Sequence, residues 1–325
     1  MPPRQTSRIF ATHDAYLAGT LHFVWSEAQI KKSIEHFTLA VGRDPDCAAG
    51  HAELALAYYR MGLLYDYPPI VTFGGTKEYA LMALRLDPGL ARAHAALAVY
   101  NLFGAWNCSE AEASSRRAIE LDPSNSQAHV IRSACHLVMG RPDGAVEDLE
   151  KAHRLDPHCP TVGMAYAIFG LFARRYESAS QRCQEILQRD PSSALAHLVL
   201  GTCYAQKGDS ARALTHCEKA RDIGSGQILH ATALCSVYAM AGQRDSAERL
   251  LDELVAAQKQ QYVRYVFLAQ ASVSLRKNKE TLEWLEKAYE QRDPLLVFLK
   301  CDPRFEPLAR SARFRNLLGR IGLPI

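Results

Sequence analysis

The 325-residue sequence lacks a strong excess of charge of either sign, a long apolar run and a dense framework of cysteines. Its formal net charge is only +3, whereas a nucleic-acid-binding protein is expected to carry a concentrated basic face. The longest strongly apolar stretch, residues 160–173, is shorter than the roughly 20 residues that a membrane helix needs. The sequence therefore predicts neither nucleic acid nor membrane as a partner.

The nine cysteines are scattered along the chain. Several occupy apolar positions, among them Cys183, Cys217 and Cys235, where free cysteine behaves as a small buried hydrophobe. The dense disulfide pattern of small secreted domains is missing, and residues 1–6 contain no apolar stretch of the kind that signal peptides carry. These features predict a soluble chain in a reducing, cytoplasmic location.

Catalytic and metal-binding motifs are missing as well. Residues 224–226 read Gly-Ser-Gly, without the strand–turn–helix context of a nucleophile elbow. Residues 74–77 contain glycine and lysine without the spacing of a phosphate loop. The densest group of metal donors, within residues 153–159, matches no known zinc pattern. We therefore predict no enzyme activity, no cofactor and no metal ion.

The sequence does contain an internal repeat. Asp-Pro pairs begin at Asp122, Asp156 and Asp190, each 34 residues after the last (156 − 122 and 190 − 156). Earlier pairs begin at Asp44 and Asp87, with steps of 43 and 35 residues (87 − 44 and 122 − 87). A fixed period of this length is typical of the tetratricopeptide repeat, a helix–turn–helix of about 34 residues.

Each repeat follows the same order of small and bulky residues, clearest in Ala194, His197, Leu200, Gly201, Tyr204, Gly208, Ala213, Cys217 and Ala220. A small residue on each helix lets the two helices of a hairpin cross closely, and proline ends the second helix. The expected crossing residues are Ala55, Ala98, Ser133, Ala167 and Gly201 on the first helices, and Ala111, Ala145, Ala179 and Ala213 on the second. One hairpin cannot bury its own apolar face, so the hairpins must stack. We predict an all-α, right-handed α-solenoid of about eight hairpins with a C-terminal helical cap.

The predicted organisation has three parts: an N-terminal tail (1–11), a repeat array (12–293) and a C-terminal capping segment (294–325) that covers the last apolar face. Repeat one is expected to begin near Thr12, with Gly19 at its crossing. Within repeat two, the prolines and glycines of residues 63–75 interrupt the helical period and predict an irregular loop. In repeat eight, residues 276–279 lack the glycine that the turn usually carries.

Four histidines, His51, His94, His129 and His197, recur at the bulky position of the first helix. Recurrence at one repeat position predicts a packing role rather than a metal site.

The final segment carries the most specific resemblance, through Leu282-Glu-Trp-Leu-Glu-Lys-Ala-Tyr289, Phe298-Leu-Lys-Cys-Asp-Pro-Arg-Phe305 and Ile321-Gly-Leu-Pro324. The sequence resembles, over its whole length, the tetratricopeptide sensor regions attached to bacterial winged-helix transcriptional regulators, nucleotide cyclases and Ser/Thr protein kinases. The resemblance implies a regulatory or interaction role, with the output chemistry on a separate N-terminal domain. No such domain precedes repeat one here, which leaves open a part of a larger protein or a stand-alone adaptor.

The phase of the family pattern assigns an inner wall to the concave groove of the solenoid. Its residues are Tyr59, Arg60, Val99, Leu102, Phe103, Val130, Leu137, Val138, Met164, Ile168, Leu171, Phe172, Leu195 and Leu198. Toward the C-terminus the wall becomes polar, with Thr202, Gln206, Thr232, Ser236, Gln270 and Ser274. The Lys, Asn and Arg residues that chaperone-binding tetratricopeptide domains use at these places are absent.

An apolar inner wall predicts a non-enzymatic protein–protein interaction scaffold of bacterial regulatory type, which binds an apolar peptide or an amphipathic helix. The alternative is a sensor or enzyme that holds a hydrophobic small molecule inside the superhelix. Self-association would bury the same face. If the wall is open, Phe103→Asp and Phe172→Asp should abolish partner capture and leave the helical content unchanged.

Overall fold

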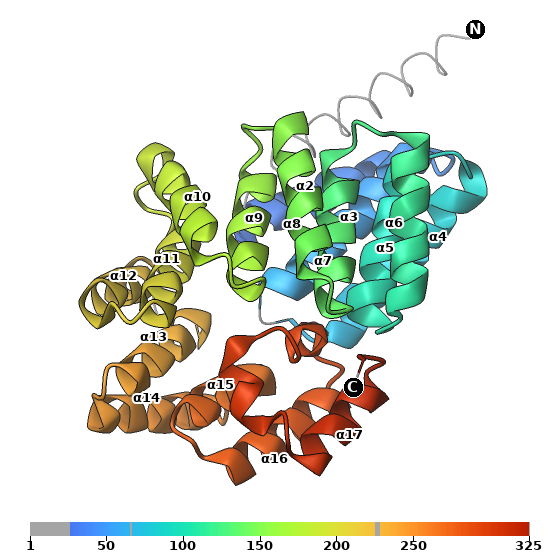
Figure 1. Cartoon of the computed structure of the whole chain (residues 1–325). Helices are drawn as coiled ribbons and strands as arrows, with labels where there is room; N and C mark the ends of the chain where they lie inside the picture. Colours follow the sequence, from blue (N-terminus) through green and yellow to red (C-terminus); the bar gives the residue numbers. More distant parts are fainter. Residues whose placement is uncertain (1–26, 66, 225–227, 325) are drawn as a thin grey trace, which may run out of the picture. The chain divides into compact units, whose positions relative to one another are not determined.

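The structure is a computed structural model that describes residues 27–65, 67–224 and 228–324. These ranges contain α-helices, one π-helical turn and two 3-10 helices, with no β-strand among the described residues (Figure 1). The predicted all-α solenoid of helical hairpins is confirmed. The expected tail, and the crossing at Gly19 in repeat one, lie outside the described residues.

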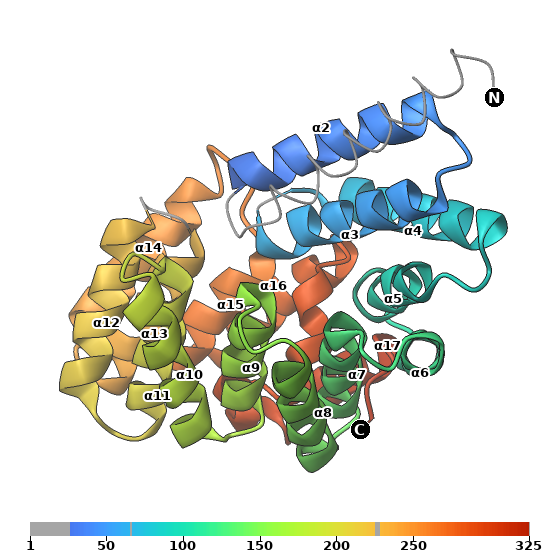
Figure 2. The same cartoon turned by 90° about the horizontal axis from the view of Figure 1, so that it is seen from above.

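The chain forms two compact units, one ending at Cys135 and the other beginning at His136. The helices described in the first unit are α2 (Glu27–Arg43), α3 (Ala48–Leu64), α4 (Pro69–Leu86), α5 (Ala91–Val99) with the π-helical turn η1 (Tyr100–Gly104), and α6 (Cys108–Leu121). The boundary between the units falls within α7 (Ser126–Val138). Helices α3 and α4 form one hairpin and α5 and α6 the next, and the two helices of each pair lie side by side (Figure 2).

The second unit continues the hairpins and ends in the capping segment. Its elements are α8 (Pro142–Leu155), α9 (Pro160–Phe172), α10 (Tyr176–Arg189), α11 (Ala194–Gln206), α12 (Ser210–Ile223), α13 (Ile228–Met240), α14 (Arg244–Ala257), α15 (Tyr265–Ser274), α16 (Asn278–Glu290), η2 (Pro294–Phe298), η3 (Pro303–Leu308) and α17 (Ala312–Arg320). Each odd-numbered helix from α9 to α15 packs on the even-numbered helix that follows it.

The crossing residues are packed as the repeat pattern predicts. Ala55, Ala98, Ser133 and Ala167 on the first helices are fully buried, as are Ala111, Ala145, Ala179 and Ala213 on the second helices. At Gly201 a Cβ atom would lie 2.5 Å from Cys217 Sγ and 3.0 Å from the carbonyl oxygen of Ala213. The small residues therefore set how closely the paired helices approach.

The turns inside the five hairpins from α7–α8 to α15–α16 use a left-handed backbone conformation. Gly140, Gly208 and Gly242 have φ angles of 76°, 82° and 78°, a region that glycine adopts without steric cost. Arg174 and Arg276 stand at the equivalent positions, 34 residues from their glycine neighbours (174 − 140 and 276 − 242), and both have φ angles of 60°. For a non-glycine residue this conformation costs roughly 1 kcal/mol or more. These two turns therefore keep an arginine where glycine would be less strained.

The irregular loop predicted for residues 63–75 is wrong over residues 63–64 and 69–75, which are helical. Helix α3 continues to Leu64, and α4 begins at Pro69 and passes through both glycines. Proline is well suited to the first position of a helix, since its missing N–H would have no partner there. Gly75 lies where a Cβ atom would be 3.1 Å from the Tyr58 ring. The glycine permits close helix packing here and does not interrupt the helix.

Candidate functional site

In the first unit the apolar residues of the inner wall pack against the chain itself. Val99 and Leu102 are fully buried, and Phe103 is 1% exposed. The ring of Tyr59 lies 5.5 Å from that of Phe103 and 6.4 Å from that of Phe73 on α4, and burial raises the pKa of Tyr59 to about 12. Tyr59 is the half-buried member of this cluster.

Two further wall residues of the first unit are buried. Val130 on α7 is 6% exposed. Arg60 on α3 is also buried, with its Nη2 atom 3.5 Å from Oε1 of Gln127 on α7. The Arg60 side chain therefore links α3 to α7.

In the second unit the inner-wall residues of α7, α9 and α11 are buried or half-buried. Leu137, Val138, Met164, Leu171 and Leu198 are buried, whereas Ile168, Phe172 and Leu195 are half-buried. The half-buried side chains remain partly exposed to solvent.

The capping segment covers part of this wall. The ring of Phe298, at the end of η2, stacks on Phe172 with 5.0 Å between centroids and lies 5.7 Å from Phe169. Phe298 itself is buried. The sequence predicted that the segment covers the last hairpin, but it gave no signal for this contact with α9.

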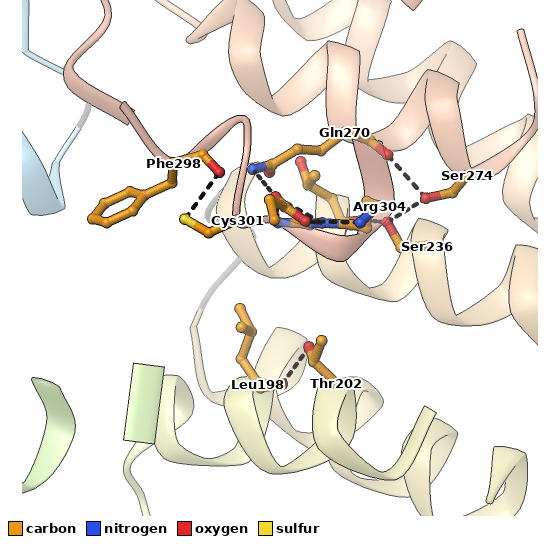
Figure 3. A network of polar contacts seen from close by, with 10 residues as sticks. Leu198, Thr202, Ser236, Gln270, Ser274, Phe298, Cys301 and Arg304 are labelled. Carbon is orange, nitrogen blue, oxygen red and sulfur yellow. Dashed lines mark hydrogen bonds and ion pairs between the residues drawn. The ribbon is translucent and has the colours of Figure 1, made fainter. Parts of the chain in front are cut away.

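The polar part of the inner wall forms a series of hydrogen bonds (Figure 3). The Ser274 hydroxyl on α15 donates to Oγ of Ser236 on α13, 2.9 Å away. The Ser236 and Thr232 hydroxyls donate to backbone carbonyl oxygens one helical turn earlier, as does Thr202 on α11. The hydroxyl donors of this surface are thus satisfied by acceptors within the helices that form it.

Asp302 of the capping segment faces this polar surface. Nε2 of Gln270 on α15 donates to its Oδ2 atom at 3.4 Å. Arg304 binds both carboxylate oxygens, Nε to Oδ1 at 2.9 Å and Nη2 to Oδ2 at 2.7 Å. The buried carboxylate is thus neutralised within the segment that carries it.

The recurring histidines have a second role beyond packing. The Nε2 atoms of His51, His94 and His197 lie 2.9, 3.0 and 3.2 Å from the carbonyl oxygen of the proline six residues earlier. Since a carbonyl only accepts, the ring N–H donates and ties each first helix to the preceding Asp-Pro turn. The recurrent Pro-x5-His spacing is the sequence signal that would have indicated this bond.

Metal binding and membrane insertion were the two other possibilities to consider for the described residues. Over the described ranges, no three His, Cys, Asp or Glu side chains are grouped so that they could hold a metal ion. None of the helices that the structure describes is long and apolar enough to cross a membrane.

Acid should destabilise the second unit through His230 on α13. Burial lowers the pKa of His230 to about 4, against about 6.5 for an unperturbed histidine. Below pH 6.5 His230 binds a proton in the unfolded chain, whereas in the folded chain it stays neutral down to about pH 4. The free energy of unfolding is therefore highest above pH 6.5 and falls by about 3 kcal/mol as the pH drops to 4.

Urea unfolding at pH 7.5 and pH 4.5 measures this effect. We expect His230→Gln to lose less stability between the two pH values than the unsubstituted chain, whatever its stability at pH 7.5. His158→Gln, at an exposed position, is the matched control and should keep the original pH dependence. Equal pH dependence in all three proteins would contradict the assignment.

Comparison with known proteins agrees with the repeat and the fold. One tetratricopeptide repeat model matches residues 90–159 and 171–228, and a second matches residues 136–197. Tetratricopeptide repeat protein 37 of Xenopus laevis is 26% identical over 291 residues. That match covers 85% of this chain, but the chain spans only 18% of that protein.

Two solved structures share the fold. The crystal structure of yeast Tom70 superposes with a TM-score of 0.53 at 16% identity, covering 95% of this chain and 67% of that chain. A chain of the APC/C hetero-tetramer Cut9–Hcn1 superposes with a TM-score of 0.63 at 15% identity, covering 93% of this chain and 54% of that one. The 34-residue hairpins, their close crossings and the repeat-model matches together identify this chain as a tetratricopeptide repeat protein.

Proposed function

We propose that this protein is an adaptor of bacterial regulatory type, which binds an apolar peptide or an amphipathic helix of a protein partner along its inner wall. The fold is that of a protein-interaction scaffold, and tetratricopeptide proteins are generally non-enzymatic. The regulatory assignment rests on the resemblance of residues 282–324 to bacterial sensor regions.

One observation carries the proposal: Ile168, Phe172 and Leu195 are large apolar side chains on the inner wall that stay partly open to solvent. They come from α9 and α11, the first helices of adjacent hairpins. Apolar side chains that are exposed together usually mark an interaction surface. An apolar helix face or an extended apolar peptide supplies the matching surface.

The surface depressions favour a protein partner over a small molecule. A depression of about 530 Å³ on α4 is lined by Glu78, Leu81, Leu84 and Arg85. Another, of about 470 Å³, is lined by residues 276–280 and Glu283. Neither is lined by inner-wall residues, whereas small-molecule sites are usually enclosed pockets.

Peptide selection from a displayed random library tests the proposal. We expect the intact protein to enrich apolar or amphipathic sequences, and Ile168→Asp/Leu195→Asp to bind the selected peptides roughly tenfold or more weakly, because two apolar contacts are replaced by charge. Leu155→Asp is the matched control, since Leu155 is an exposed leucine at the end of α8.

Equal binding by the double variant and the intact protein would contradict the proposal. Size-exclusion chromatography supplies the further check. A dimer of the intact protein that Ile168→Asp/Leu195→Asp converts to a monomer would assign the wall to self-association instead.

A further inference from the structure

Residues 294–308 of the capping segment, called the clasp below, contact two separate helices of the second unit. On one side, η3 packs against α15 and Gln270 binds Asp302. On the other side, Phe298 stacks on Phe172 of α9, and Arg174 in the turn after α9 pairs with Glu306 at 2.9 Å. The clasp therefore spans from the last hairpin back to a hairpin more than 100 residues earlier (270 − 166 for the midpoints of α15 and α9).

The two attachments differ in kind. Leu296, Val297, Phe305 and Leu308 are at most 2% exposed and make the clasp part of the core. The α9 side instead depends on an aromatic anchor and on an ion pair whose side chains are 54% and 65% exposed. An ion pair so exposed contributes little stability. The α9 side is thus the one that opens more easily.

Opening this side leaves the buried Asp302 carboxylate paired. The Asp302 carboxylate is neutralised by Arg304, which lies on the clasp itself. The hydroxyl groups of Thr202, Thr232 and Ser236 donate to their own helices. Separating a buried charge from its partner is strongly unfavourable, and for Asp302 that cost does not arise.

Arg174 makes its contact with the clasp from a left-handed turn position. Its φ angle of 60° falls where Gly140 and Gly208 stand in the neighbouring hairpins. Strained backbone of this kind is enriched at functional sites. The side chain of Arg174 reaches the Glu306 carboxylate.

We propose that Phe169, Phe172 and Arg174 form a recognition site for a peptide that presents an aromatic side chain and, eight residues later, a carboxylate. The clasp fills this site with Phe298 and Glu306, which have that spacing (306 − 298), until a partner segment of the same chemistry displaces them. The inference rests on the proposed function, because it names the partner class and adds a self-occupied state to the same wall. As the tethered clasp has a high effective concentration, the closed protein binds such peptides weakly.

Fluorescence anisotropy with a labelled peptide of residues 294–310 tests the proposal on the full chain. We expect weak binding to the unsubstituted protein and roughly tenfold tighter binding to Phe298→Ala, since removal of the aromatic anchor releases the clasp. Glu306→Gln, at an exposed position, opens the clasp less and should bind a few-fold tighter. If Phe298→Ala does not fold, Glu306→Gln takes its place in the comparison with the unsubstituted protein. A peptide with alanine for Phe298 and glutamine for Glu306 should not bind.

Arg174→Gly separates recognition from backbone strain. Added to Phe298→Ala, it should weaken peptide binding at least several-fold, although it relaxes the turn. Arg276→Gly relaxes the equivalent turn near α16 and should leave peptide binding unchanged.

Hydrogen exchange should also be faster across residues 294–310 in Phe298→Ala and Glu306→Gln, and unchanged in α13.

Each remaining outcome decides against the proposal. Equal peptide binding by the closed and opened proteins, or none by an opened protein that circular dichroism shows to be folded, overturns it. If library-selected peptides bind the inner wall while the clasp peptide does not, the clasp proposal fails and the adaptor function stands. If neither kind of peptide binds, both proposals fail.

Discussion

Phe103→Asp is expected to unfold the first unit. Phe103 is 1% exposed, and its ring packs 5.5 Å from that of Tyr59. Loss of a buried phenylalanine ring costs about 3–5 kcal/mol, and a carboxylate in its place has no solvent to stabilise it. Since whole domains are stable by about 5–15 kcal/mol, this change removes most of the stability of the unit.

Circular dichroism during thermal and urea unfolding measures the effect. Leu39→Asp is the matched control, because Leu39 is a leucine of the same unit that is 45% exposed, and surface substitutions usually change stability by about 0.5 kcal/mol or less. Similar unfolding midpoints for the two variants would contradict the packing described here. The repeat phase alone predicted that Phe103→Asp keeps the helical content, and burial reverses that expectation.

Gly201→Ala is expected to destabilise the second unit by about 1–3 kcal/mol, the usual cost of overpacking a core. In an ordinary helix interior the same change is favourable by about 1 kcal/mol. Here the new Cβ atom would lie 2.5 Å from Cys217 Sγ, 3.0 Å from the Ala213 carbonyl oxygen and 3.1 Å from the Cys217 nitrogen. Two of these atoms belong to the backbone of α12, so the helices themselves must separate.

The urea midpoint of Gly201→Ala should be compared with that of Gly74→Ala. Gly74 lies within α4 and has no atom within 4 Å of an added Cβ, so alanine there should raise the midpoint. Adding Cys217→Ala to Gly201→Ala removes the sulfur contact and should recover only part of the loss, since the backbone contacts remain. Midpoints that shift in the same direction for both glycine variants would show that crossing distance does not decide stability.

The sequence predicted well where a contact lies inside one hairpin. A period of 34 residues placed the crossings at positions such as Ala167 and Ala179, which are fully buried. This works because residues of one hairpin are close in sequence, so helix geometry fixes which of them face each other. The pattern failed at residues 69–75, where the prolines and glycines that are usual in loops lie in α4. Gly75 instead accommodates the Tyr58 ring, a contact between two helices that a local pattern does not reveal.

The sequence by itself determined the repeat and the all-α fold of stacked helical hairpins. Only the tertiary structure decided what covers the inner wall. Phe298 meets Phe172 because small rotations between successive hairpins accumulate along a solenoid. No residue spacing encodes that sum, so the clasp over α9 could not be predicted from the repeat pattern.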